Sequence, residues 1–138
     1  MAATQEKVLT ALRTLRTLIS SKKRWTQGRF ALDKQGGSRQ WNDPEATCFC
    51  LDGGMRRAAG GDKELAVAMQ QELSRTILRR QRRRLREYHE ATRGGAEVLR
   101  RYNDNRRRQH RHIRSVVTQT ISRVRRAGVQ PIPLPVAV

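Results

Sequence analysis

Apolar residues recur at helical spacing in three stretches of the chain, which predicts three amphipathic helices. The first is expected over residues 4–20 with Thr4 as its N-cap. The second covers 63 to about 91 behind an N-cap at Asp62, and the last covers roughly 107–126. Their stripes consist of Val8, Leu12, Leu15 and Ile19, then Ala66, Met69, Leu73 and Ile77, then Ile113, Val117, Ile121 and Val124. If unbroken, the helix over 63–91 is too long for a small core to cover, and its second half would project.

The middle of the chain has a different pattern. Residues 25–41 contain Gly28, Gly36 and Gly37 without a helical period, which indicates a short hairpin or an ordered loop pinned by Trp25 and Trp41. A further helix is predicted over 44–59, with Pro44 in its first turn and Gly60-Gly61 at its end. Gly53 and Gly54 in its middle cost about 1 kcal/mol each relative to alanine, and close approach of another backbone would explain them.

After residue 95 the sequence predicts short elements and an extended C-terminal tail. Residues 96–102 predict a helical turn and 102–105 a turn. Residues 127–138 carry three prolines and no charged side chain, so they cannot be helical and are expected to be polyproline-like or an edge strand. The fold class is therefore mainly α: a small bundle of about four helices, a short hairpin or ordered loop near 25–41, and an extended C-terminal tail. We expect one helical domain over 1–126 and a separate tail over 127–138.

Charge changes this picture, because it is unevenly distributed. The formal net charge is +18, and residues 75–126 contribute 18 basic against 4 acidic side chains, whereas residues 1–74 contribute 12 against 8. Six arginines fall between positions 79 and 86, and glutamates return only at 87 and 90. A solvated helix usually carries acidic residues among its arginines for i, i+4 pairing. The pattern indicates an anionic partner, although arginine stems covering apolar surface on a solvated helix are the alternative.

Phosphate is the commonest such partner, and a guanidinium can grip it with two parallel hydrogen bonds. A GC-rich genome explains the preference for arginine over lysine equally well, but it does not explain the net charge. Few aromatic residues are available for stacking on bases, which favours contact with the phosphates of duplex DNA or structured RNA and little reading of sequence. The residues expected to bind nucleic acid are Arg79, Arg80, Arg82, Arg83, Arg84, Arg86, Arg106, Arg107, Arg108, Arg111 and Arg114.

Other chemistries are less well supported by the sequence. Cys48-x-Cys50 and His110-x-His112 have ligand types that suit zinc, but the two ligands of a zinc pair are usually separated by two or more residues. The alternative is that Cys50 lies mid-helix and packs in the core as a small apolar residue. The glycine pairs lack the phosphate-binding frame G-x-x-x-x-G-K-[ST]. We therefore expect a non-enzymatic protein without a cofactor or metal.

The main rival is a structural or inhibitory protein-interaction module, for example a virion component. Its arginine-rich helix and its tail would meet protein partners, and the tail residues expected to do so are Pro131, Pro133, Leu134 and Pro135. No apolar stretch approaches the roughly 20 residues that span a membrane, and no signal peptide pattern opens the chain. The expected location is the cytoplasm or a virion, and the oligomeric state stays open.

One segment resembles a known family. "WTQGRFALDKQGG", then "DPEATCFCLDGGMRRAA", then "YND" at 102–104 are similar to a small bacterial and phage family of unknown function with the pattern W-x-x-G, A-x-x-x-C-L-x-G-A and W-N-D. The chain departs from it at Gly54, where alanine is usual, and at Tyr102, where tryptophan is usual. The resemblance covers mainly residues 25–58 and implies a compact, mostly helical fold but no activity. On this reading, the arginine-rich 75–114 region and the tail are additions to the scaffold. The residues that match are Trp25, Gly28, Ala31, Asp33, Gly36, Ala46, Cys50, Leu51 and Gly53.

Overall fold

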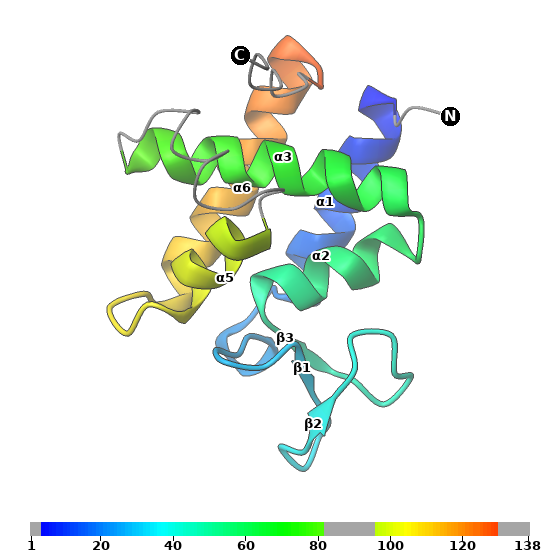
Figure 1. Ribbon diagram of the computed structural model, residues 1–138, viewed down its shortest axis with the longest axis vertical. Helices are drawn as coiled ribbons and strands as arrows, with labels where there is room; N and C mark the ends of the chain where they lie inside the picture. Colours follow the sequence, from blue (N-terminus) through cyan, green and yellow to red (C-terminus); the bar gives the residue numbers. More distant parts are fainter. Residues whose placement is uncertain (1–3, 82–95, 130–138) are drawn as a thin grey trace, which may run out of the picture.

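The computed structural model describes residues 4–81 and 96–129. Within them, five α-helices pack with a small three-stranded sheet (Figure 1). The mainly helical class is confirmed, with one helix more than expected and a sheet rather than a bare hairpin. The predicted tail over 130–138 lies outside the described residues.

Three helices build the core. α1 (Gln5–Leu18) begins behind Thr4, whose hydroxyl accepts from the amide of Lys7 at 3.2 Å, as predicted. The side-chain amide of Gln5, at the start of α1, donates to the carbonyl of Val124 near the end of α6 (His110–Ala127) at 2.9 Å. His110, at the start of α6, contacts the carbonyl of Ile19 at the end of α1, so the two helices run antiparallel. Figure 1 shows α3 (Lys63–Arg80), in green, lying across both. The three predicted stripes meet between these helices; all their residues are buried except Ala66, which is half-buried.

The predicted helix over 44–59 is wrong in its first half. Asp43 caps a turn instead, since its carboxylate accepts from the amide of Glu45 at 2.8 Å and its carbonyl accepts from the amide of Ala46. The chain then extends into β3 (Cys48–Phe49) before α2 (Leu51–Ala59) begins. Cys50 is therefore the N-cap of α2 and not a mid-helix residue, and its sulfur accepts from the amide of Gly53 at 3.2 Å.

The expected hairpin over 25–41 is confirmed. β1 (Ala31–Leu32) and β2 (Ser38–Arg39) pair antiparallel, and β3 pairs with the other side of β1, giving the order β2-β1-β3. Asp33 shapes the turn, because its carboxylate accepts from the amides of Gln35 and Gly37. The side-chain hydrogen bond from Arg39, followed by those from the turn amides, holds the pKa of Asp33 below its ordinary value.

The predicted close approach of another backbone is found at Gly53 but not at Gly54. A Cβ at Gly53 would stand 2.1 Å from the carbonyl oxygen of Phe30, so a side chain would collide with the backbone beside β1. A Cβ at Gly54 would meet Leu15 Cδ1 at 2.9 Å, and this contact is with a flexible side chain. Glycine at 53 thus lets α2 lie directly against the chain that leads into the sheet.

The last part of the chain departs from prediction in three places. α3 ends at Arg80 with Gln81 as its C-cap and does not run unbroken to about residue 91; positions 82–91 of the predicted helix lie outside the described residues. The segment after the undescribed residues is a full helix, α5 (Ala96–Asp104), which takes up three residues of the expected turn at 102–105. α6 begins at His110, so Arg106, Arg107 and Arg108 precede its first turn.

Candidate nucleic-acid interface

The structure describes seven of the eleven arginines that the sequence assigns to nucleic acid. Arg79, Arg80, Arg106, Arg107, Arg111 and Arg114 are exposed, whereas Arg108 is half-buried. Arg82, Arg83, Arg84 and Arg86 lie outside the described residues, and so do Pro131, Pro133, Leu134 and Pro135 of the tail.

Arg80 brings the end of α3 onto the surface of α6. Its Nε donates to Gln119 Oε1 at 2.6 Å and its Nη2 donates to Ser115 Oγ at 2.7 Å. An open hollow between the two helices is lined by Arg80, His110, Arg111, Arg114, Ser115, Thr118 and Gln119. Arg80 from α3 thus shares one surface hollow with Arg111 and Arg114 from α6. The hollow also contains two hydroxyl side chains and one amide side chain of α6.

A basic triplet that the sequence reasoning left unassigned lies at the same end of α6. Lys22, Lys23 and Arg24 form the 3-10 turn η1 (Lys22–Arg24), and all three are exposed. The segments on either side of them contact His110. Its Nε2 donates to the carbonyl of Ile19 at 2.6 Å, and its ring lies 6.2 Å from that of Trp25. Three consecutive basic residues were the available signal, but only the fold shows their neighbour.

We call this region the α6 basic surface. It joins the hollow to the exposed residues around the start of α6, and its cations are Lys22, Lys23, Arg24, Arg80, Arg106, Arg107, Arg111 and Arg114. In the part of the chain that the structure describes, none of these eight forms an ion pair; the arginine pairs there involve Arg39, Arg56, Arg101 and Arg123.

Arg108 differs from its neighbours. Its guanidinium carbon lies 3.9 Å above the ring centroid of Tyr102, a cation–π contact. Its Nε is buried without a hydrogen-bond partner among the described residues. Arg108 therefore packs the loop between α5 and α6 against α5, while Arg106 and Arg107 are exposed from the same loop.

Asn103 locks that loop to the segment that begins with Trp25. Its Oδ1 accepts from Trp25 Nε1 at 2.7 Å and from the amide of Leu51 at 3.0 Å. Its Nδ2 donates to the carbonyl of Thr26 and to Asp104 Oδ1, which also accepts from the amide of Gly28. The W-x-x-G, C-L and Y-N-D parts of the sequence pattern therefore meet at the buried side-chain amide of Asn103. This contact explains why the three parts occur together in one pattern.

A buried polar network fixes α3 against α6. Arg123 donates to the carboxylate of Glu72 at 2.7 Å and to its backbone carbonyl at 2.6 Å, and the Glu72 side chain is fully buried. The hydroxyls of Thr76 and Thr120 are 2.7 Å apart beside this pair. Because the network lies one to two turns before Arg80 on α3, it determines where Arg80 meets α6. Nothing in the apolar pattern marked these residues.

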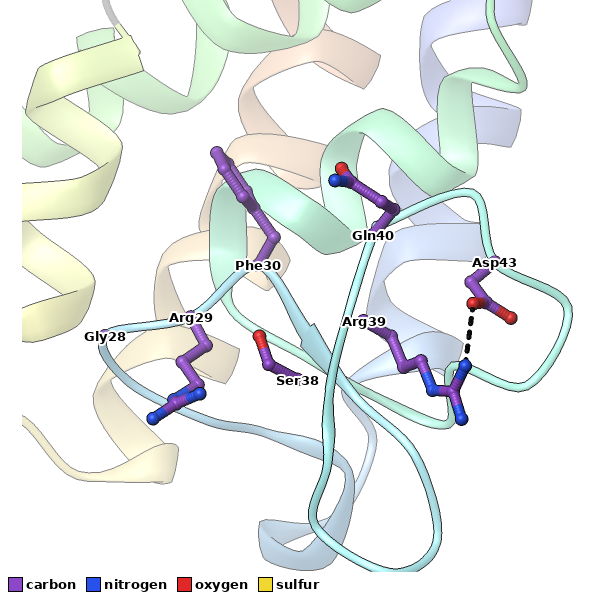
Figure 2. Close-up of a pocket in the computed structure, with 7 residues that line it drawn as sticks. All are labelled: Gly28, Arg29, Phe30, Ser38, Arg39, Gln40 and Asp43. Atoms are coloured by element: carbon purple, nitrogen blue, oxygen red, sulfur yellow. Dashed lines mark hydrogen bonds and ion pairs between the residues drawn. The ribbon is translucent and has the colours of Figure 1, made fainter.

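A second hollow lies beside the hairpin (Figure 2) and is lined by Gly28, Arg29, Phe30, Ser38, Arg39, Gln40 and Asp43. Its central cation is already neutralised, because Arg39 pairs with Asp33 at 2.9 Å, Asp43 at 3.3 Å and Glu45 at 3.1 Å. Figure 2 shows the dashed pair from Arg39 to Asp43 and the Phe30 ring directed away from it. This hollow is less suited to an anion than the one at Arg80.

The two cysteines are free and buried. Burial, as the largest cause, raises the pKa of Cys50 to about 11, so the thiol stays protonated at neutral pH and is a poor nucleophile. Among residues 4–81 and 96–129, no three His, Cys, Asp or Glu side chains cluster in a way that could hold a metal ion. The described helices also include none that is long and apolar enough to cross a membrane.

Comparison with known proteins gives a family but no function. Residues 3–123 match the family of unknown function DUF6197. The match extends well beyond 25–58, so the whole arginine-rich 75–114 region lies within the family's span and is not an addition to it, which corrects the sequence interpretation. No curated protein and no solved structure matches the chain significantly.

Proposed function

The chain belongs to DUF6197, a family of unknown function, and from its own surface we propose that it is a non-enzymatic protein that binds the phosphates of nucleic acid. The observation that supports this most is the α6 basic surface. Its eight cations come from η1, from the end of α3, and from α6 with its preceding loop, and the described residues offer them no carboxylate partner. Like charges gathered in this way repel each other unless an anion meets them.

Arg80 suggests how a phosphate would be held. Two hydrogen bonds to α6 occupy its Nε and one hydrogen of Nη2. The outer edge of the guanidinium, with Nη1 and the second hydrogen of Nη2, stays available for two parallel hydrogen bonds to one phosphate. Since the side chain is already oriented, binding costs little further side-chain entropy.

A polyanion fits this surface better than a single small anion, because only three of the eight cations line the hollow, and the other five lie on η1 and on the loop before α6. Binding would release counterions from the phosphate backbone, and the affinity would fall steeply with salt. Single-stranded binding by stacking is disfavoured. Among the described aromatic side chains, Phe49 and Tyr102 are buried, and Trp25 and Trp41 are half-buried. The exposed Phe30 lies under the guanidinium of Arg56.

The test compares three proteins on a random-sequence 20-base-pair duplex by fluorescence anisotropy at one ionic strength. The first is wild type and the second carries Arg80→Gln, Arg111→Gln and Arg114→Gln. The third removes the same charge elsewhere through Lys34→Gln, Lys63→Gln and Arg101→Gln, which are exposed residues of the hairpin turn, the start of α3 and α5. Circular dichroism checks that all three are folded.

We expect the arginine variant to bind the duplex at least tenfold more weakly than wild type. The control variant is expected to stay within about threefold. Equal losses in both variants would mean that net charge alone attracts the duplex, and no duplex binding by wild type would reject the proposal and direct the search to an acidic protein partner.

A further inference from the structure

α6 presents one continuous polar face to solvent. Its exposed polar side chains fall within an arc of about 140° at 3.6 residues per turn. They are Arg111, Arg114, Ser115, Thr118, Gln119, Ser122, Arg125 and Arg126. The opposite side of the helix, with Ile113, Val117 and Ile121, is buried in the core. No acidic residue occurs between positions 105 and 127.

The order of residues along this face is informative. Arginine pairs lie at both ends, 111 with 114 and 125 with 126, and short hydroxyl side chains at 115, 118 and 122 lie between them. The centres of the two pairs are about 13 residues or roughly 20 Å apart along the axis. The major groove of B-form DNA is about 12 Å wide and admits an α-helix. Arginine side chains at both ends would therefore reach the phosphate backbones on its two sides.

The middle of the face suits base edges. Serine and threonine hydroxyls and a glutamine amide can bond donors or acceptors in the major groove, and their small size lets the helix approach closely. Arg80 adds a guanidinium at the same place, since it is held between Ser115 and Gln119. Its outer edge is the one that pairs with guanine or with phosphate.

Resting on the proposed function, we propose that the ligand is B-form duplex DNA and that α6 lies in its major groove. The polar middle of the exposed face would point toward the base pairs, and the terminal arginines would contact both phosphate backbones. Duplex RNA has the same charge but a deep, narrow major groove that side chains cannot read. The arrangement therefore distinguishes two polyanions that an undirected basic surface would bind alike.

Two double variants that keep the net charge test this placement. Thr118→Leu with Ser122→Leu enlarges the middle of the α6 face, and Thr10→Leu with Thr14→Leu makes a matched change at two exposed threonines of α1. Each protein is titrated with a 20-base-pair DNA duplex and with an RNA duplex of the same sequence at equal salt.

We expect wild type to bind the DNA at least tenfold more tightly than the RNA. The α6 variant should lose at least tenfold in DNA affinity, and the α1 variant should stay within twofold of wild type. Equal affinity for the two duplexes, or DNA binding that the α6 leucines leave unchanged, would overturn the major-groove placement. In either of those cases the phosphate-binding proposal survives, because it fails when neither duplex binds or when the arginine variant loses no more affinity than its charge-matched control.

Discussion

At the scale of single residues, the side chain of Asn103 forms four hydrogen bonds that join three parts of the chain. Its amide uses both lone pairs and both hydrogens, and it joins the Trp25 indole, the start of α2 and the end of α5. Replacement by alanine would leave the Trp25 and Leu51 donors unpaired in a buried site, and each unpaired donor costs about 1–3 kcal/mol.

We therefore expect Asn103→Ala to lower the free energy of unfolding by about 3 kcal/mol or more, measured by urea denaturation followed through tryptophan fluorescence. Asn105→Ala is the matched control, since the side chain of the exposed Asn105 accepts a single hydrogen bond among the described residues, from the amide of Arg107, and its backbone bonds are kept. Its loss should be about 1 kcal/mol or less. Similar losses in the two variants would contradict the role given to Asn103.

Cys50 makes stability depend on pH in the alkaline range. Its folded pKa of about 11 lies above its ordinary value of 9.0, mainly because of burial, so the folded state holds the proton more tightly than the unfolded state. Stability is therefore complete below pH 9 and is lost as the pH rises toward 11, by at most about 1.4 kcal/mol per pH unit. Cys50→Ser keeps the cap and removes the titration. Its unfolding free energy should fall less steeply than that of wild type between pH 9 and 11, and parallel curves would refute this.

At the scale of elements, the packing of α2 depends on one missing side chain. Both Gly53→Ala and Gly54→Ala gain about 1 kcal/mol of helix propensity, but only the Gly53 substitution meets a backbone oxygen. We expect Gly53→Ala to destabilise the protein by about 2 kcal/mol or more through overpacking. Gly54→Ala should stay within about 1 kcal/mol of wild type, because Leu15 can move. Thermal unfolding of the pair gives the comparison, and the reverse order would be evidence against the close approach.

The contact between α3 and α6 contains a buried ion pair whose two members depend on each other. The carboxylate of Glu72 also interacts electrostatically with the buried Arg75, so Arg123→Ala removes one of two guanidiniums that act on it. Breaking a buried pair costs up to about 3–5 kcal/mol, and chemical denaturation measures the loss. Arg101→Ala, which breaks an exposed pair with Glu97, should change stability by about 1 kcal/mol or less. Equal losses in the Arg123 and Arg101 variants would argue against the role of the buried pair.

The apolar stripes of α1, α3 and α6 were readable from the sequence because each is long, periodic and capped. The false first half of the predicted helix over 44–59 has a local cause: an Asp-Pro-Glu start serves a turn as well as a helix, and pairing of Cys48 with Leu32 decides between them. The arginines were visible as a charge run, but their grouping was not. Arg80 meets Ser115 across 35 positions, and the contacts of Ile19 and Trp25 with His110 bring the triplet at 22–24 to the start of α6.

At the scale of the whole molecule, the packing of the helices determines where the arginines of the α6 basic surface lie. α6 contributes its apolar side to the core and its arginine-rich side to solvent, and the buried Glu72–Arg123 pair holds α3 so that Arg80 lies on that solvent side. Asn103 and Arg108 hold the loop that carries Arg106 and Arg107. The structural residues thus position the α6 basic surface, and its use as a phosphate-binding surface is the central claim.

The most direct test of that claim is the salt dependence of duplex binding by wild type and by the variant carrying Arg80→Gln, Arg111→Gln and Arg114→Gln. Each neutralised phosphate contributes about −0.9 to the slope of log K against log salt. If the three arginines each contact one phosphate, the variant's slope should be shallower by about 2.7. Equal slopes for the two proteins would show that these side chains do not meet phosphate and would contradict the account.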